Sequence, residues 1–148
     1  HLKYPIVAIR GGKYMSIKWQ NSWNIEVGQI DNQHKALVEQ VSRLLEACRK
    51  GGSKQEVANA LNFLSRYVRE HFQYEEEQHR IHNYPDRDAH ARLHNTFTHE
   101  VERLYRRFEE EGVSIQFTIL LNRKLVDWLI DHIGRVDQRF GAFVNGKS

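Results

Sequence analysis

The chain has 148 residues, 40% of them hydrophobic, which is enough to bury one substantial core, so we expect a single folded domain. Because Cys48 is the one cysteine, no intrachain disulfide can form, and the lone thiol fits a reducing compartment. No apolar run approaches the roughly 20 residues that span a bilayer, and the first segment lacks the apolar stretch of a secretion signal. We therefore expect a cytoplasmic protein without a membrane partner.

The net charge of +3 sits at one end of the chain. Three of the 22 basic residues lie in the first 14 positions, and the remaining 19 balance the 19 acidic residues. Later arginines alternate with glutamates, as Arg106 and Arg107 do with Glu102 and Glu109. A surface that follows phosphates needs a local excess of positive charge, so we expect a solvated helix face and no nucleic-acid partner.

Residues 1–14 (HLKYPIVAIRGGKY) contain Pro5 and the pair Gly11-Gly12, lack a periodic continuation and precede Met15. We interpret them as a leader or an arm introduced by cloning, so that the folded domain comprises residues 15–148. The alternative is a short β-like segment, with strand-like character over residues 6–9, that docks on the domain or on a partner.

From residue 31 onward, four segments carry apolar residues at helical spacing between helix start and stop signals. The first begins near Asp31 and stops at Gly51-Gly52. The second begins at Ser53, and Glu56 three residues later predicts a capping box.

The third predicted helix follows Pro85-Asp86 and ends before Gly112. The fourth begins near Ser114 and carries apolar residues as far as Leu129. Because the connections are only a few residues long, neighbouring helices should run antiparallel. We therefore predict an all-α fold, an up-down-up-down antiparallel four-helix bundle with an extended N-terminal arm.

Histidines and carboxylates fall on the apolar faces of these helices, where an unpaired polar group is costly. Residues four apart share a helix face, so His71 with Glu75, and His90 with His94, can each reach one metal site. Together, seven residues on four helices predict a metal centre inside the bundle: His34, His71, Glu75, His90, His94, His132 and Asp137.

Asp137 lies five residues after His132, a spacing that turns it away on a regular helix. Gly134 between them predicts a π-like turn that brings both side chains inward. Five histidines then supply five bonds to metal, and two bridging carboxylates supply four. One bridging oxygen adds two more bonds, whereas two octahedral ions need about twelve. Roughly one position stays open, and on a redox metal an open position is a place for dioxygen.

Each of these residues has a simpler interpretation when taken alone. His90 and His94 fit a satisfied core or surface pair, or part of a zinc site. Glu75 fits an exposed member of an acidic run, and Asp137 fits a helix cap. A structural zinc needs only four ligands, so it leaves several inward polar residues unexplained.

Over residues 17–140 the chain resembles the hemerythrin family, in particular the bacterial hemerythrins. The stretch IKWQNSWNIEVGQIDNQHKAL resembles the family's amino-terminal arm and first ligand, YVREHFQYEE its HFxxEE element, YPDRDAHARLHNTF its HxxxH element, and WLIDHIGRVD its HxxxxD element. The resemblance implies a di-iron centre of two non-haem iron ions with a bridging oxo or hydroxo group. It implies one iron held by His90, His94 and His132, the other by His34 and His71, and Glu75 and Asp137 as bridges, with the open position on the second iron.

The same resemblance implies an apolar pocket over the open position, formed by Leu37, Phe72, Trp128, Leu129 and Ile133. Their simpler interpretation is ordinary core. Relatives often carry a large apolar residue, commonly Met, where this chain has His79. We interpret His79 as facing solvent near the end of the bundle, and the alternatives are a donor to a ligand, a proton relay or an additional ligand.

We expect reversible binding of dioxygen for storage, delivery or sensing, and not an enzyme. A sensor would act through a signalling partner or a fused output module, which requires this chain to be an excised domain. The alternative is a di-iron oxidase, a ferroxidase, or a reductase of peroxide or nitric oxide. Ferritin-like enzymes use carboxylate-rich sites with Glu-x-x-His pairs, whereas the predicted site is rich in histidine. A structural zinc or iron-storage bundle is a third alternative.

Overall fold

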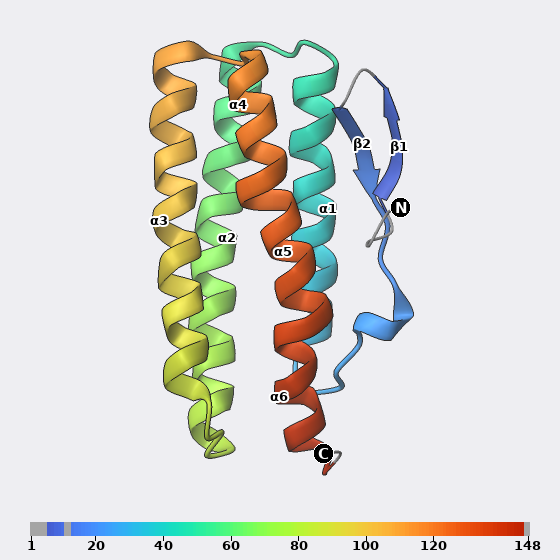
Figure 1. The fold of residues 1–148 in the computed structure, drawn as a ribbon, viewed down its shortest axis with the longest axis vertical. Helices are drawn as coiled ribbons and strands as arrows, with labels where there is room; N and C mark the ends of the chain where they lie inside the picture. The colour runs from blue at the N-terminus through green and yellow to red at the C-terminus, as the bar shows by residue number, and fades with distance from the viewer. Residues whose placement is uncertain (1–5, 11–12, 147–148) are drawn as a thin grey trace.

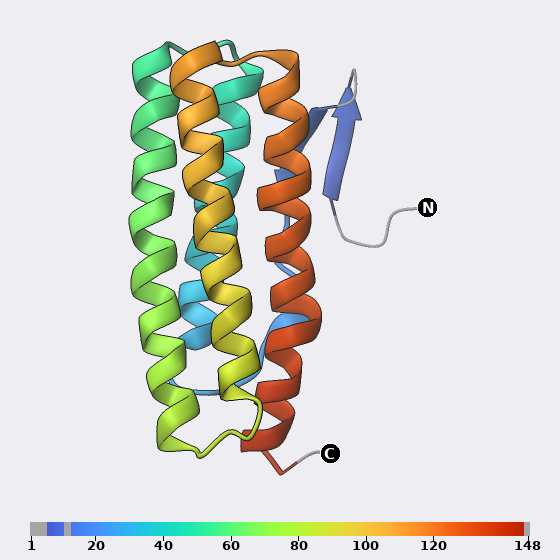
Figure 2. The same cartoon turned by 60° about the vertical axis from the view of Figure 1, so that its left-hand side comes forward.

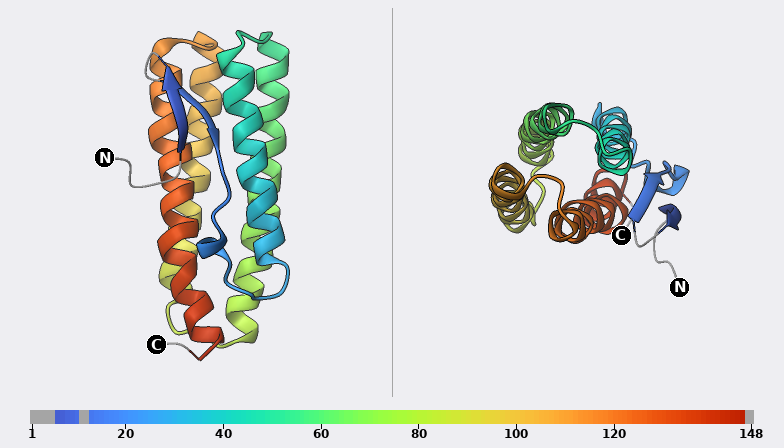
Figure 3. Two further views of the ribbon diagram at one scale, coloured as in Figure 1. Left: turned by 90° about the vertical axis from the view of Figure 1, so that its right-hand side faces the viewer. Right: turned by 90° about the horizontal axis from the view of Figure 1, so that it is seen from above.

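Four helical rods lie side by side along the long axis of the computed structural model, which describes residues 6–10 and 13–146 (Figures 1 and 2). The first three rods are α1 (Ile30–Arg49), α2 (Lys54–Ile81) and α3 (Arg87–Glu111). The fourth is α4 (Ile115–Leu120), a π-helical segment (Leu121–Asp127), α5 (Trp128–Asp131), a second π-helical segment (His132–Val136) and α6 (Asp137–Val144). Seen from the end, the rods surround one common axis (Figure 3), so the predicted helical bundle is confirmed.

The helix ends follow from capping residues. Ser53 accepts a hydrogen bond from the backbone N–H of Glu56 at 3.1 Å, and Ser114 accepts one from Phe117 at 3.0 Å. The helix α3 ends at Gly112, whose φ of 67° favours glycine. These caps place the helix boundaries close to those predicted from the sequence.

The apolar core is divided into two clusters along the bundle. The larger cluster includes Leu37 on α1 and Phe72 on α2, whereas Ile30, Tyr84 and Phe140 belong to a smaller cluster at the other end. On α1, the predicted ligand His34 lies between Ile30 of the smaller cluster and Leu37 of the larger, and on the fourth rod the predicted ligand Asp137 lies between Ile133 of the larger cluster and Phe140 of the smaller. The ligands are therefore enclosed by apolar side chains on both sides.

A β-hairpin precedes the bundle. The strands β1 (Ile6–Arg10) and β2 (Lys13–Ile17) pair antiparallel, with Arg10 opposite Lys13 and Ile6 opposite Ile17. The hairpin lies beside the bundle (Figure 3), and Ile17 exchanges two hydrogen bonds with the Ser42 hydroxyl of α1, at 3.1 and 3.2 Å. This agrees with the alternative of a docking β-like segment, and β2 crosses the predicted boundary at residues 14 and 15. Residues 1–5 and 11–12 of the predicted leader lie outside the described residues.

The arm between the hairpin and α1 includes a short 3-10 helix, η1 (Asn21–Trp23), and is held by backbone contacts. The Asp31 carboxylate accepts hydrogen bonds from the backbone N–H groups of Ile25 and Glu26, at 2.8 and 2.9 Å. The Gln138 amide donates to the Trp23 carbonyl at 2.9 Å. The arm thus joins the start of α1 to the end of the fourth rod. Within the described chain, no helix combines the length and apolarity needed to cross a membrane.

Candidate metal centre

All four rods contribute buried polar side chains to one place inside the bundle. The helix α1 provides His34, α2 provides His71 and Glu75, α3 provides His90 and His94, and the fourth rod provides His132 and Asp137. None of the seven is more than 3% exposed. The structure therefore brings together every residue of the predicted ligand set, and binding of metal by them remains a prediction.

The seven residues form two clusters that share both carboxylates. One cluster comprises Glu75, His90, His94, His132 and Asp137, and the other His34, His71, Glu75 and Asp137. In each cluster one atom per residue lies within 4.8 Å of the others, a span that suits ligands around a single ion. This division is the one that the resemblance implies.

Each oxygen of Glu75 faces a different cluster. Its Oε1 lies 2.9 Å from His90 Nε2 and 3.1 Å from His94 Nε2. Its Oε2 lies 3.8 Å from the Nε2 atoms of both His34 and His71. A carboxylate oriented in this way can contribute one oxygen to each of two ions.

Asp137 is divided between the clusters in the same way. Its Oδ1 lies 3.0 Å from His90 Nε2 and 3.2 Å from His132 Nε2, whereas its Oδ2 lies 3.0 Å from His34 Nε2. His132 and Asp137 point the same way because the chain between them, His132–Val136, is π-helical, in which the repeat is i to i+5. The predicted π-like turn is confirmed.

Two ligand rings are oriented by polar partners on their outer side. The Nδ1 of His71 lies 2.7 Å from the amide oxygen of Gln33, and the Nδ1 of His94 lies 2.7 Å from a carboxylate oxygen of Glu76. Because these oxygens can only accept, each Nδ1 carries the proton and each Nε2 presents a lone pair to the cluster. Sequence reasoning missed Gln33 and Glu76. Their positions next to His34 and Glu75 were the only available signal.

The carboxylates and histidines of the two clusters shift one another's pKa values. Burial alone would raise the pKa values of Glu75 and Asp137, but the surrounding histidines, His132 among them, hold both well below their usual range. Burial disfavours a charged His132, yet the Asp137 and Glu75 carboxylates raise its pKa to about 9. Burial, followed by the charge of His34, lowers the pKa of His71 to about 3 and keeps it neutral.

The residues fit a pair of cations. None of the four carboxylate oxygens of Glu75 and Asp137 has a hydrogen-bond partner, although all are buried. The Nε2 atoms of His34 and His71 approach to 3.1 Å, and those of His94 and His132 also approach to 3.1 Å. Metal ions would satisfy the converging lone pairs and compensate the buried negative charge.

Aromatic rings cover the outer faces of two ligands. Phe72 stacks on His94 with ring centroids 3.7 Å apart and 4° between planes, and Trp128 stacks on His132 at 4.4 Å and 11°. Phe97, which sequence reasoning did not single out, stacks on Trp128 at 4.0 Å. Of the predicted pocket residues, Leu37, Phe72, Leu129 and Ile133 are buried and Trp128 is half-buried.

His79 does not face solvent, so that interpretation of the sequence is wrong. Its side chain is 0% exposed, because Tyr84 and Phe140 cover the end of α2 with ring centroids 5.2 and 4.4 Å from the imidazole. Burial, followed by the charge of His90, lowers the pKa of His79 to about 4, so the ring is neutral near pH 7.

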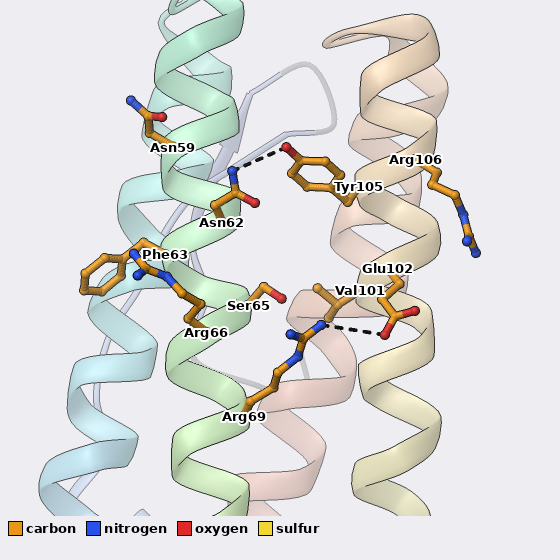
Figure 4. Close-up of a pocket in the computed structure, with 10 residues that line it drawn as sticks. All are labelled: Asn59, Asn62, Phe63, Ser65, Arg66, Arg69, Val101, Glu102, Tyr105 and Arg106. Atoms are coloured by element: carbon orange, nitrogen blue, oxygen red, sulfur yellow. Dashed lines mark hydrogen bonds and ion pairs between the residues drawn. The ribbon is translucent and has the colours of Figure 1, made fainter.

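A surface groove of about 780 Å³ lies between α2 and α3 (Figure 4). Arg69 and Glu102 face each other there with 3.7 Å between Nη2 and Oε1, and the Asn62 amide donates to the Tyr105 hydroxyl at 3.3 Å. None of the predicted ligands lines this groove. It is therefore separate from the candidate metal centre.

Buried histidines and carboxylates that converge from four helical rods define a helical bundle with a candidate metal site. Across residues 26–144 the chain matches the family model described as "Hemerythrin HHE cation binding domain", and it belongs to the hemerythrin family. The resemblance inferred from the sequence is thus confirmed.

Several relatives are similar over most of their length. The chain is 30% identical over 123 residues to a bacteriohemerythrin of Stenotrophomonas maltophilia, covering 82% of this chain and 77% of the relative. It is 32% identical over 120 residues to one of Pseudomonas aeruginosa, covering 80% and 75%. It is 30% identical over 115 residues to one of Methylococcus capsulatus, covering 78% and 86%.

Proposed function

We propose that the protein binds dioxygen reversibly at a non-haem di-iron centre held by the seven clustered residues. The observation that carries this proposal is the unequal division of donors between two clusters that share their carboxylates. The first cluster offers three histidines and two carboxylate oxygens, and the second offers two histidines and the other two oxygens. The side of His34 and His71 is one donor short.

The missing donor leaves room for a small ligand beside His34 and His71. With one bridging oxo or hydroxo group, an octahedral ion in the first cluster is complete and one in the second keeps one free position. When bound, the iron pair supplies the electrons that dioxygen needs in order to bind. The surrounding chain supplies the shape and the exclusion of water.

The side chains around the centre favour reversible binding. The buried Leu37, Phe72, Leu129 and Ile133 are predicted to line the open side, where they would keep water and its protons away. Phe72 and Trp128 also fix the rings of His94 and His132 by stacking, so the first cluster is held rigidly.

The histidine-rich ligand set favours binding over catalysis, because the ferritin-like di-iron enzymes use more carboxylates. We therefore propose an oxygen-binding protein for storage, delivery or sensing, acting in the cytoplasm and requiring no nucleic acid. A di-iron oxidase, a ferroxidase, or a reductase of peroxide or nitric oxide is the competing function.

The test is anaerobic reconstitution of the metal-free chain with Fe²⁺, metal counting, and absorption spectra through repeated addition and removal of dioxygen. We expect two irons per chain and a visible band that appears with dioxygen and disappears on its removal. The exposed His99 provides a matched control. It lies on α3, the helix that also carries His90 and His94, and His99→Ala removes an imidazole that is not part of the cluster.

Three outcomes would contradict the proposal. Irreversible oxidation with turnover of a reductant would favour the enzyme. A single metal per chain would contradict the di-iron centre. Unchanged metal binding by both His132→Ala and Asp137→Ala would show that the metal lies elsewhere.

A further inference from the structure

We propose that His79 is a positioning residue of the metal centre, whose imidazole accepts a hydrogen bond from the outer nitrogen of the ligand His90, directly or through one water. This inference rests on the metal-binding part of the proposed function and goes beyond the predicted ligand set. It starts from a buried imidazole that has no hydrogen-bond partner.

The position of His79 is fixed by the end of α2. Its backbone carbonyl accepts a hydrogen bond from the Tyr84 N–H at 2.9 Å, and the Phe140 ring lies against it edge-on at 77°. The His90 ring lies 4.4 Å away between centroids, tilted by 55°. His79 is thus enclosed between two aromatic side chains and one metal-ligand candidate.

The polar atoms at this position lack partners on both sides. Neither ring nitrogen of His79 has a hydrogen-bond partner, and the Nδ1 of His90 also has none, although all three atoms are buried. A buried polar group without a partner is unfavourable, because it has lost its hydrogen bonds to water. A contact between His79 and His90 would satisfy a donor and an acceptor together.

The protonation states suit this contact. The Nε2 of His90 faces the cluster, at 2.9 Å from Glu75 and 3.0 Å from Asp137, so a bound cation would take its lone pair and leave the proton on Nδ1. The His79 imidazole offers a nitrogen lone pair, which can accept the hydrogen bond from that proton.

Two neighbouring ligands already have an acceptor at the outer nitrogen. Gln33 orients His71 and Glu76 orients His94, each through the outer Nδ1. His79 would do this for His90. It is not itself assigned as a ligand, because among the described residues neither metal cluster includes it.

The test compares the intact chain with His79→Met, His79→Gln and the control His99→Met. Fe²⁺ affinity is measured anaerobically by competition with a chelator, and stability of the metal-free protein by urea unfolding. Loss of the residue that hydrogen-bonds the outer nitrogen of a ligand histidine typically weakens metal affinity by about 10–100-fold. We expect His79→Met to weaken the affinity for one of the two Fe²⁺ ions by this factor. His79→Gln keeps an acceptor, so its Fe²⁺ affinity should lie within about threefold of that of the intact chain.

A merely structural role predicts a different pattern, in which His79→Met destabilises the metal-free protein and leaves Fe²⁺ affinity unchanged. We expect the reverse, a loss of Fe²⁺ affinity without a matching loss of stability, because the contact with His79 orients His90 towards the ion. Equal Fe²⁺ affinity in the intact chain and His79→Met would overturn this inference and leave the di-iron proposal standing. Failure of the intact chain to bind two ions would overturn both.

Discussion

His132 and Asp137 are five residues apart on the fourth rod, yet His132 Nε2 lies 3.2 Å from Asp137 Oδ1. The π-helical segment His132–Val136 makes this possible, because one extra residue in the turn restores the facing of the two side chains. Gly134 lies inside that segment, where an added Cβ would come within 3.2 Å of the Trp23 indole nitrogen. The segment that aligns the two ligands therefore also packs against Trp23 of the N-terminal arm.

The sharing of Glu75 and Asp137 predicts two classes of ligand variant. His94→Ala should weaken one metal position and His71→Ala the other, each by at least about 100-fold, since removing a ligand exceeds the loss of its outer partner. Asp137→Asn should weaken both positions, because each oxygen faces a different cluster.

Anaerobic Fe²⁺ titration with metal counting measures both positions. His99→Ala should bind as the intact chain does. The shared-carboxylate arrangement fails if Asp137→Asn loses only one ion or if His71→Ala loses both.

Much of the bundle was predictable because its signals are local. Ser53 with Glu56, Gly112 and Ser114 mark helix ends through contacts within one turn, and the 3.6-residue period shows which face is buried. The ligand faces follow from the same period. Even the π-like turn could be predicted, because on a regular α-helix Asp137 would point away from the face that carries His132.

Contacts between helices could not be predicted in this way. Glu76 is 18 residues from its partner His94, and nothing local indicates which member of an acidic run turns inward. The burial of His79 depends on Phe140, which lies on another rod and closes the end of α2. Both features need the distance between helices, which sequence periodicity does not contain.

The outer-nitrogen partners predict a selective loss of affinity. Gln33→Leu should weaken the metal position that includes His71 by about 10–100-fold, because the ring loses the acceptor that fixes its proton and orientation. Glu76→Leu should do the same for the position that includes His94. Gln33→Glu and Glu76→Gln keep an acceptor oxygen and serve as matched controls.

Chelator competition with Fe²⁺ measures these affinities, and urea unfolding of the metal-free variants shows whether the fold has changed. Equal affinity in the leucine and the conservative variants would mean that the two outer contacts do not orient the ligand rings.

The close approach of Gly141 to Ile25 predicts how tightly the arm is held. A Cβ at position 141 would lie 2.6 Å from Ile25 Cβ, so Gly141→Ala must displace the arm. We expect a loss of about 1–3 kcal/mol in the free energy of unfolding, the usual cost of overpacking. Urea unfolding of the metal-free protein measures it.

A double-mutant cycle separates this contact from the change in helix propensity. Ile25→Gly removes both side-chain atoms that collide, Cβ and Cγ2, so Gly141→Ala should cost less in the Ile25→Gly background than alone. Additive effects of the two substitutions would show that the arm does not press on Gly141 in solution.

Acid should destabilise the metal-free protein through its buried neutral histidines. Burial lowers the folded-state pKa of His79 from 6.5 to about 4 and that of His71 to about 3. Below pH 6.5 the unfolded chain therefore binds protons that the folded chain excludes, and the free energy of unfolding falls as pH falls. At about 1.4 kcal/mol for each unit of pKa, the contribution of His79 to this loss reaches at most about 3.5 kcal/mol.

His79→Met isolates that contribution, because methionine does not titrate. Urea unfolding of the metal-free proteins between pH 4 and 8 should give a shallower acid slope for the variant, with the two curves parallel above pH 7. On the alkaline side both proteins should lose stability as pH rises through about 9, where His132 gives up the proton that Asp137 and Glu75 stabilise. Identical acid slopes would contradict the enclosure of a neutral His79 by Tyr84 and Phe140, because they would mean that the ring is charged or reaches solvent in the folded state.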